Sequence, residues 1–235
     1  MDYLEKFNAK YRKKKITNII ISSITMLMGF YSLAYVFTHW RGGGLQFRYL
    51  TVDGTIFTTV LTTIAVVVNI VEFEKYTELT KKFIYLIRLS SAVTEGIIFI
   101  VVMISQLPFF KDHMTIFTPE NMLMHVIIPI LTIASFIYND SPIGKFRFRW
   151  IFAANAYAFL YAIVVVILIA KGHISRDLVP YFFLDIRSTG VAFVLGIAAI
   201  IFCIGMGLSY VFVELNRKVY WRTLSIKEPT HKVQY

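Results

Sequence analysis

Six long apolar runs dominate this sequence, and they constrain its fold more than any other feature. A membrane-spanning helix needs about 20 mostly apolar residues to cross a hydrocarbon core about 30 Å thick. Each run meets that length, so the sequence predicts an all-α integral membrane protein with a bundle of six transmembrane helices. Little chain remains for a soluble domain, so we expect one domain over residues 1–235. The runs cover about Ile16–Thr38, Leu50–Val71, Phe83–Gln106, Pro119–Tyr138, Arg149–Ala170 and Thr189–Val213.

The basic residues predict how this bundle is oriented. Of the 24 Lys and Arg residues, 17 fall in the two tails and in the second and fourth connections, whereas six fall in the other connections. Lys and Arg concentrate on the cytoplasmic side of membrane proteins, so both termini are predicted to be cytoplasmic, in the cell membrane. The net charge of +10 then reflects topology and attraction to anionic headgroups, and we expect no nucleic-acid partner.

Three chemically useful side chains fall at the same predicted depth, near the outer surface. Thr51 opens the second run, His125 lies early in the fourth, and Asp185 precedes the sixth. A hydroxyl becomes a good nucleophile when a base takes its proton. Histidine is the usual base, and a carboxylate can fix its tautomer. The shared depth therefore makes a Thr–His–carboxylate arrangement possible.

Structural explanations for the same residues stay open. Thr51 can bond its own backbone or a neighbouring helix, as threonine often does in membrane helices. His125 can be a packing or interfacial residue. Asp185 can cap the N-terminus of the sixth helix, where carboxylates are favoured.

Other buried polar or small residues suggest alternatives. Glu95 lies in the middle of the third run, and an intramembrane carboxylate is a functional candidate by default. It could be protonated, paired with Arg88, or part of a proton pathway, which supports a transporter as an alternative function. We expect Asn69 and Asn155 to join helices by hydrogen bonds. Gly205 and Gly207 are expected to permit close helix approach. No histidine spacing suggests a metal site.

Three motifs together resemble the androgen-induced protein family, which consists of six-helix membrane proteins. Its members include threonine hydrolases that cleave fatty acid esters of hydroxy fatty acids. The resemblance implies that Thr51 is the nucleophile and His125 the catalytic histidine. Asp185 stands where the family often has Glu, and we treat it as a supporting residue. The motifs are Phe47-Arg48-Tyr49-Leu50-Thr51-Val52, Asn121-x-x-Met124-His125 with Pro129, and Tyr181-x-Phe183-Leu184-Asp185.

The working hypothesis is a lipid-ester hydrolase that opens toward the outer leaflet. Asn121 and Tyr181 are candidate donors to the oxyanion of the tetrahedral intermediate. Arg48 could hold a free carboxylate on the substrate by a bidentate contact, or could simply anchor the helix at the interface. The partner is a membrane lipid or fatty acyl ester, and neither a metal nor another cofactor is expected. The alternatives are a small-molecule or proton-coupled transporter that uses Glu95, and a lipid-binding protein without activity.

Overall fold

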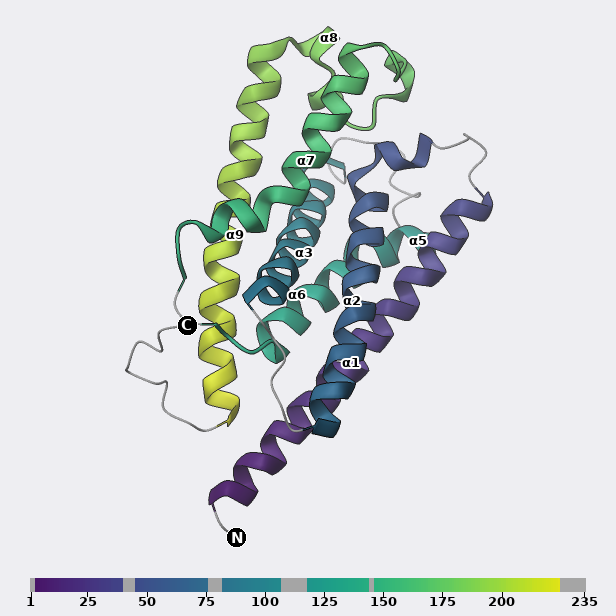
Figure 1. The fold of residues 1–235 in the computed structure, drawn as a ribbon. Helices are drawn as coiled ribbons and strands as arrows, with labels where there is room; N and C mark the ends of the chain where they lie inside the picture. The colour runs from purple at the N-terminus through teal and green to yellow at the C-terminus, as the bar shows by residue number, and fades with distance from the viewer. Residues whose placement is uncertain (1–2, 40–44, 76–81, 107–117, 144–145, 225–235) are drawn as a thin grey trace.

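Helices make up all the long elements of the computed structural model, which describes residues 3–39, 45–75, 82–106, 118–143 and 146–224 (Figure 1). Six helical segments are long and apolar enough to cross a membrane. The prediction of an all-α, six-helix membrane protein is therefore confirmed. The segments are α1 (Tyr3–His39), α2 (Leu50–Lys75), α3 (Lys82–Val101), the continuous run of α5 (Pro119–Met122), η4 (Leu123–Ile127) and α6 (Ile128–Asn139), α7 (Trp150–Ala170) and α9 (Val191–Leu224).

Short helices occupy about half of the remaining described chain. A π-helix, η2 (Val102–Gln106), continues α3, and a 3₁₀ helix, η1 (Leu45–Arg48), precedes α2. Between α7 and α9 lie η5 (Arg176–Leu178), η6 (Phe182–Leu184) and α8 (Ile186–Thr189).

The first and last helices are longer than the apolar runs that predict them. α1 begins at Tyr3 rather than near Ile16, and α9 continues to Leu224 rather than ending near Val213. At 1.5 Å per residue, the 37 residues of α1 span about 55 Å, which exceeds the hydrocarbon thickness. Apolarity marks where a helix leaves the hydrocarbon, whereas the helix itself continues through residues such as Lys14 and Lys15.

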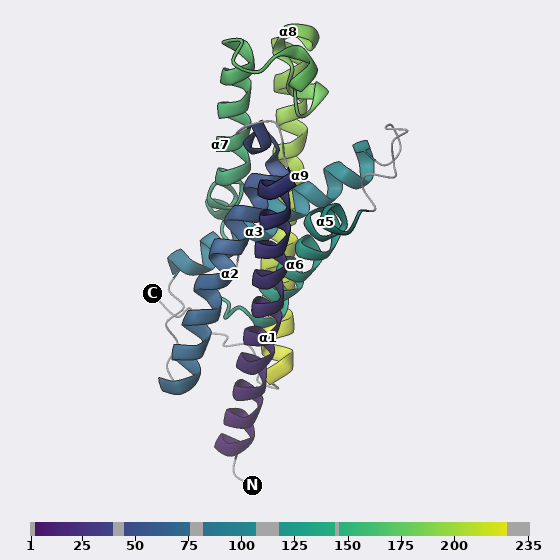
Figure 2. The same cartoon turned by 90° about the vertical axis from the view of Figure 1, so that its right-hand side faces the viewer.

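Two ends of the bundle can be distinguished in Figures 1 and 2. The start of α1 and the last turns of α9 lie at the lower end, which we call the terminal end. α8 lies at the opposite end, which we call the α8 end. Successive long helices run in alternating directions between them. The cytoplasmic location of the terminal end stays a prediction from the positive charges.

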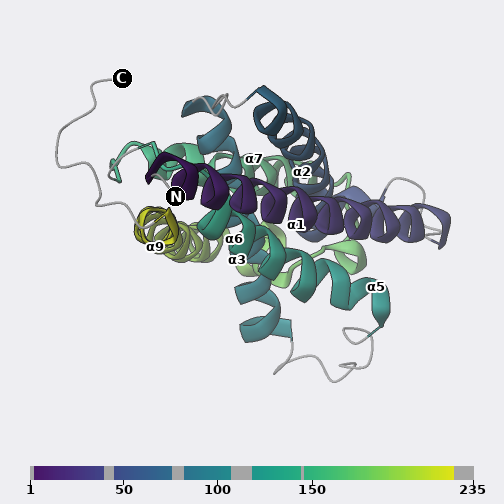
Figure 3. The same ribbon diagram turned by 90° about the horizontal axis from the view of Figure 1, so that it is seen from below.

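α3 is the most buried of the six spans. It packs against α2, α6, α7 and α9, and Leu89, Ala92 and Val93 in its middle are fully buried. Figure 3 views the bundle from the terminal end, where α9 lies beside α6, and α1 lies beside α2. A polar side chain on α3 is therefore surrounded by protein rather than by lipid.

The outer surface of the bundle is apolar, as a lipid environment requires. Leu27, Leu160 and Leu195 are each more than 60% exposed. By contrast, Glu72 and Glu95 are fully buried. Polar groups therefore turn inward, where other protein groups can bond to them.

Small residues allow two helix pairs to approach closely. A Cβ added to Gly29 on α1 would clash with the Thr59 side chain on α2. A Cβ added to Gly205 on α9 would clash with the Asn155 side chain on α7, so the role predicted for Gly205 is confirmed. The same prediction is wrong for Gly207, which has open space where a Cβ would stand.

Candidate functional site

Thr51 lies in the first turn of α2 and is buried, with 5% of its surface exposed. Its side chain is hydrogen-bonded to the hydroxyl of Tyr181, which lies just before η6 in the segment that joins α7 to α9. The ring of Tyr181 also meets the ring of Tyr49 edge to face, with centroids 6.5 Å apart. Two residues predicted for one site, 130 positions apart in the chain, are thus brought together.

The hydroxyl of Tyr181 lies at the N-terminus of α2. It is hydrogen-bonded to the backbone of Leu50 and Thr51, whose amides fall in the first turn, where helix N–H groups lack intrahelical acceptors. Burial raises the pKa of Tyr181 to about 12, although the hydrogen bonds with Thr51 oppose that shift. The phenol is therefore neutral at physiological pH and able to donate a hydrogen bond beside the Thr51 hydroxyl.

His125 lies in η4, a five-residue π-helix between α5 and α6. Isolated π-turns inside α-helices are frequent at functional sites. The Nδ1 atom of His125 is 2.8 Å from the backbone oxygen of Asn121. A carbonyl oxygen only accepts hydrogen bonds, so Nδ1 carries a proton, and in the neutral ring Nε2 then carries the lone pair. A backbone carbonyl thus performs the orienting role that the sequence hypothesis gave to a carboxylate.

Thr51 and His125 belong to segments that touch, because η4 packs against α2. Within the described ranges, no hydrogen bond joins the two side chains; Thr51 is bonded to Tyr181 and His125 to Asn121. The arrangement supplies a buried hydroxyl and an imidazole on elements that contact one another.

Asp185 caps α8 rather than extending toward the other candidates. Its Oδ1 accepts from the backbone N–H of Arg187 at 3.3 Å and from Arg187 Nε at 3.1 Å, and its Oδ2 accepts from the Ser188 hydroxyl at 2.9 Å. Burial favours a higher pKa, but the hydrogen bonds from Ser188 and Arg187 outweigh it and hold the pKa of Asp185 below its ordinary value. Its contacts are those of a structural cap, but of α8 and not of the sixth membrane-spanning helix, α9, where the sequence suggested one.

A pocket of about 340 Å³ lies between α7 and the start of α2. Arg48 and Asp53 supply charged groups to it, whereas neither Thr51 nor His125 lines it. The Tyr161 hydroxyl donates to the backbone oxygen of Arg48, which ties α7 to the end of η1. The remaining lining residues are aromatic or aliphatic except for one histidine: Phe47, Tyr157, Leu160, Tyr161, Val164, Val165, Leu168, His173 and Ile174.

Glu95 is fully buried in α3 and faces α2. Thr58 on α2 donates to Glu95 Oε1 at 2.7 Å, and the Thr58 hydroxyl is 2.8 Å from that of Ser91. Arg88 instead pairs with Asp140, so the suggested pairing of Glu95 with Arg88 is not what the structure has.

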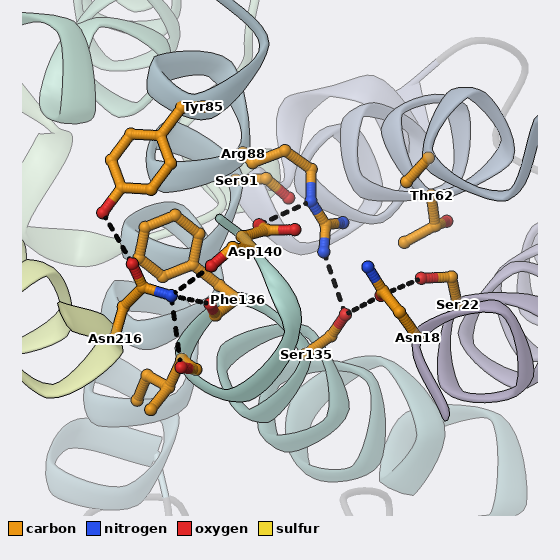
Figure 4. Close-up of polar contacts among 12 residues, drawn as sticks. Asn18, Ser22, Thr62, Tyr85, Arg88, Ser91, Ser135, Phe136, Asp140 and Asn216 are labelled. Carbon is orange, nitrogen blue, oxygen red and sulfur yellow. Dashed lines mark hydrogen bonds and ion pairs between the residues drawn. The ribbon is translucent and has the colours of Figure 1, made fainter. Parts of the chain in front are cut away.

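The terminal end of the bundle contains a larger polar network (Figure 4). Arg88 is its centre: Nε is 3.1 Å from Asp140 Oδ2, and Nη2 donates to Ser135 at 2.9 Å. Ser135 in turn donates to Asn18 on α1 at 3.2 Å. On the other side, Asn216 of α9 donates to the backbone oxygen of Asp140 at 2.7 Å. The network therefore connects four helices through buried side chains.

Further contacts extend this network. Lys15 on α1 pairs with Glu72 on α2, and the Asn69 side chain accepts from Lys15 and from Asn18, which confirms that Asn69 joins helices. Asn155 differs, because its amide donates within its own helix, to the backbone oxygen of Ile151 at 2.8 Å, although its oxygen lies against Gly205.

Sequence reasoning missed most of this network. Lys14 and Lys15 precede the first apolar run, yet both are only 4% exposed in α1. Asp140 follows the fourth apolar run and Asn216 follows the sixth, so apolarity gives no reason to expect either of them at a helix contact. The spacing of Lys15, Asn18 and Ser22, at three and four residues, is the signal that could have revealed a polar helix face.

Searches of protein-family models, curated proteins and solved structures found no match to this chain. Among the described residues, no group of three or more His, Cys, Asp or Glu could hold a metal ion. The resemblance to the androgen-induced family therefore stays a prediction from the three motifs, and the chain is placed by its architecture as a six-helix multi-pass membrane protein.

Proposed function

We propose that this protein hydrolyses lipid esters inside the membrane, with Thr51 as the nucleophile and His125 as the base. The observation that carries the proposal is the hydrogen bond between Thr51 and Tyr181 at the N-terminus of α2. It combines a buried nucleophile with a neutral phenol, which is also hydrogen-bonded to the backbone of Leu50 and Thr51. Donors of that kind can stabilise the oxyanion of an acyl-transfer reaction.

The proposed reaction has two halves. Thr51 Oγ1 attacks the ester carbonyl carbon while His125 Nε2 takes the hydroxyl proton, and Tyr181 donates to the oxyanion. The carbon–oxygen bond then breaks, and the leaving alcohol takes the proton from His125. Water, activated by the neutral His125, next attacks the acyl–Thr51 ester, which releases a fatty acid and restores Thr51.

The tautomer of His125 fits this role. Nδ1 donates to the Asn121 backbone oxygen, so Nε2 is the acceptor that a general base needs. In structures without substrate, the hydrogen bond between nucleophile and base is often long and forms only in the Michaelis complex. We infer that the ester enters between η4 and α2, the two elements that carry His125 and Thr51 and that contact one another.

The pocket beside α7 suits an acyl chain that ends in a carboxylate. Its volume of about 340 Å³ is within the range of small-molecule sites, and its α7 wall consists of aliphatic side chains and two tyrosines. Arg48 at its rim could bind a carboxylate by a bidentate contact. Fatty acid esters of hydroxy fatty acids carry such a group, so they are the substrate class we propose.

The test is hydrolysis of a branched fatty acid ester by detergent-purified protein. Wild type should release fatty acid, and Thr51→Ala and His125→Ala should each lose more than about 1,000-fold in rate, as expected when a nucleophile or its base is removed. Thr63→Ala on the same helix and His39→Ala serve as matched controls and should retain activity. Turnover that survives Thr51→Ala would remove Thr51 as the nucleophile.

A second candidate is lipid binding without turnover. It is favoured by one observation: the pocket that holds Arg48 and Asp53 is not lined by Thr51 or His125. This alternative predicts that a radiolabelled fatty acid ester binds wild type, Thr51→Ala and His125→Ala equally and is recovered intact. Arg48→Met would then weaken binding, while Thr63→Ala would leave it unchanged.

A further inference from the structure

Glu95 is a buried carboxyl that the proposed hydrolysis does not use. It lies in α3, the most buried span, and none of its surface is exposed. Oε1 accepts a hydrogen bond from Thr58, whereas Oε2 has no hydrogen-bond partner in the structure. Half of this carboxyl group is therefore unsatisfied in a place from which lipid and bulk water are excluded.

The surroundings of Glu95 are rich in hydroxyl oxygens. Thr58 links Glu95 to Ser91, which lies one turn earlier on α3. Gly54 lets α2 come close to α3 here, because a Cβ at Gly54 would lie 2.6 Å from Ile98 Cδ1, one turn after Glu95. The hydroxyls of Thr55, one turn before Thr58, and of Thr94 are also buried without a hydrogen-bond partner. Buried oxygens with unused hydrogen-bonding capacity therefore lie on the segments that carry Thr58 and Glu95.

Among the described residues, no ion pair includes Glu95. The ion pairs of the described residues are Lys15–Glu72, Arg88–Asp140, Arg187–Asp185 and Arg217–Glu214. Arg88, two turns away on α3, is thereby committed to Asp140. The other titratable groups on elements packed against this part of α3 are Asp53 on α2, His125 on η4, Tyr157 and Tyr161 on α7, and Cys203 on α9.

An isolated ionised carboxylate is very costly in an apolar interior, so such a group is neutralised by a proton or by a bound ion. Carboxylate and hydroxyl oxygens are the ligands that hard cations prefer. We propose that Glu95, Thr58 and Ser91 form an intramembrane site for a monovalent cation, either a proton or Na⁺. Cation binding would then stabilise the contact between α2 and α3.

The test is thermal unfolding of detergent-purified protein between about pH 6 and pH 9, in choline chloride and in NaCl. Protonation keeps Glu95 neutral at low pH, and deprotonation leaves an uncompensated buried charge. In choline chloride the Tm of wild type should therefore fall by about 4 °C or more as pH rises, which corresponds to one or two kcal/mol for a chain of this size. Glu95→Gln should remove that dependence, whereas Glu74→Gln, at an exposed glutamate of α2, should keep it.

The NaCl arm separates the two cations. If Na⁺ is the ligand, NaCl restores the wild-type Tm at pH 9 in a saturable manner and has no such effect on Glu95→Gln. If the proton is the ligand, NaCl and choline chloride give the same curves. An equal response of wild type and Glu95→Gln to both pH and Na⁺ would overturn the proposal.

A second measurement uses wild type alone, so it holds even if Glu95→Gln fails to fold. Dicyclohexylcarbodiimide enters membranes and modifies protonated carboxyl groups, and mass spectrometry locates the modified residue. Modification of Glu95 should fall several-fold from pH 6 to pH 9, and Na⁺ should reduce it further only if Na⁺ is the ligand. The proposal would be contradicted if the modification of Glu95 depended on neither pH nor Na⁺, or if Glu95 were modified at neither pH.

Discussion

The two ends of the bundle differ in how they treat buried polar groups. At the terminal end, Arg88 bonds Asp140 and Ser135, Ser135 bonds Asn18, and Asn216 bonds the backbone of Asp140, so four helices are connected (Figure 4). Toward the α8 end, the Thr51 side chain bonds one phenol, that of Tyr181. His125 bonds one carbonyl of its own helical segment.

This difference suggests that one end of the bundle stabilises the fold and that the other end carries the proposed chemistry. Arg88 Nη1 is buried without a hydrogen-bond partner, but Nε and Nη2 of the same side chain are bonded to Asp140 and Ser135, and such a buried network fixes the helices in one arrangement. Groups with spare hydrogen-bonding capacity can instead engage a substrate or an ion, and they depend on a rigid frame to hold them in position. We therefore interpret the terminal end as the structural frame that fixes the helices. The functional region is the part of the bundle that contains Glu95, Thr51, His125 and Tyr181.

The largest expected effect comes from breaking the buried ion pair. Arg88→Met leaves Asp140 buried and unpaired, which typically costs about 3–5 kcal/mol. The matched variant at the α8 end, Arg187→Met, removes an arginine that is 22% exposed and should cost about 1 kcal/mol or less. Thermal unfolding in detergent measures both. If Arg187→Met lost more stability than Arg88→Met, the assignment of the structural frame and the functional region would be reversed.

A second comparison uses two fully buried asparagines. Asn216→Leu removes donors to the backbone oxygens of Phe136, Ile137 and Asp140 and the acceptor for Tyr85, so we expect a cost of about 2–3 kcal/mol. Asn155 makes one hydrogen bond, within its own helix, but a leucine at this position would press on Gly205. Asn155→Ala is therefore the better control, and its cost in unfolding free energy should be about 1 kcal/mol lower than that of Asn216→Leu. Chemical denaturation in mixed micelles compares them, and equal losses would show that the cross-helix bonds contribute little.

Tyr181→Phe should reduce activity more than stability. It removes a donor to the proposed oxyanion, and we expect the rate of ester hydrolysis to fall about 10- to 100-fold, somewhat less than for a donor in a fully preorganised oxyanion hole. Because backbone N–H groups of α2 remain, some activity should persist. The control variant Tyr210→Phe, at an exposed tyrosine of α9, should leave the rate of hydrolysis unchanged. An unchanged rate for Tyr181→Phe would exclude the phenol from the reaction.

The smallest expected effect concerns the cap of α8. The folded-state pKa of Asp185 is lowered, so its contribution to stability is present above the ordinary carboxyl pKa and is lost as pH falls through the folded value. Asp185→Asn should therefore destabilise by about 0.5–1 kcal/mol at pH 7, and the difference should vanish below about pH 3. Parallel melting curves across pH would detect it. A difference that grows on acidification would contradict the sign of the pKa shift.

The sequence was sufficient to predict the number and approximate centres of the spans, because apolar length alone is demanded by the bilayer. It also indicated Thr51, Tyr181 and His125 by motif and depth. The sequence did not predict hydrogen-bond and ion-pair partners that depend on how each helix is rotated about its axis. The pairing of Arg88 with Asp140, the burial of Lys15 against Glu72 and the backbone partner of His125 each depend on which face a helix presents, and neither apolarity nor spacing determines that face across distant segments.

The most direct test of the account is to locate the activated nucleophile chemically. A fluorophosphonate probe applied to the protein in membranes, followed by peptide mass spectrometry, should modify Thr51 in wild type and in Thr63→Ala. His125→Ala should abolish the modification, because the threonine then lacks its base. Modification of another residue, persistence of labelling in Thr51→Ala, or no labelling of wild type would contradict the central claim that Thr51 and His125 form a reactive pair.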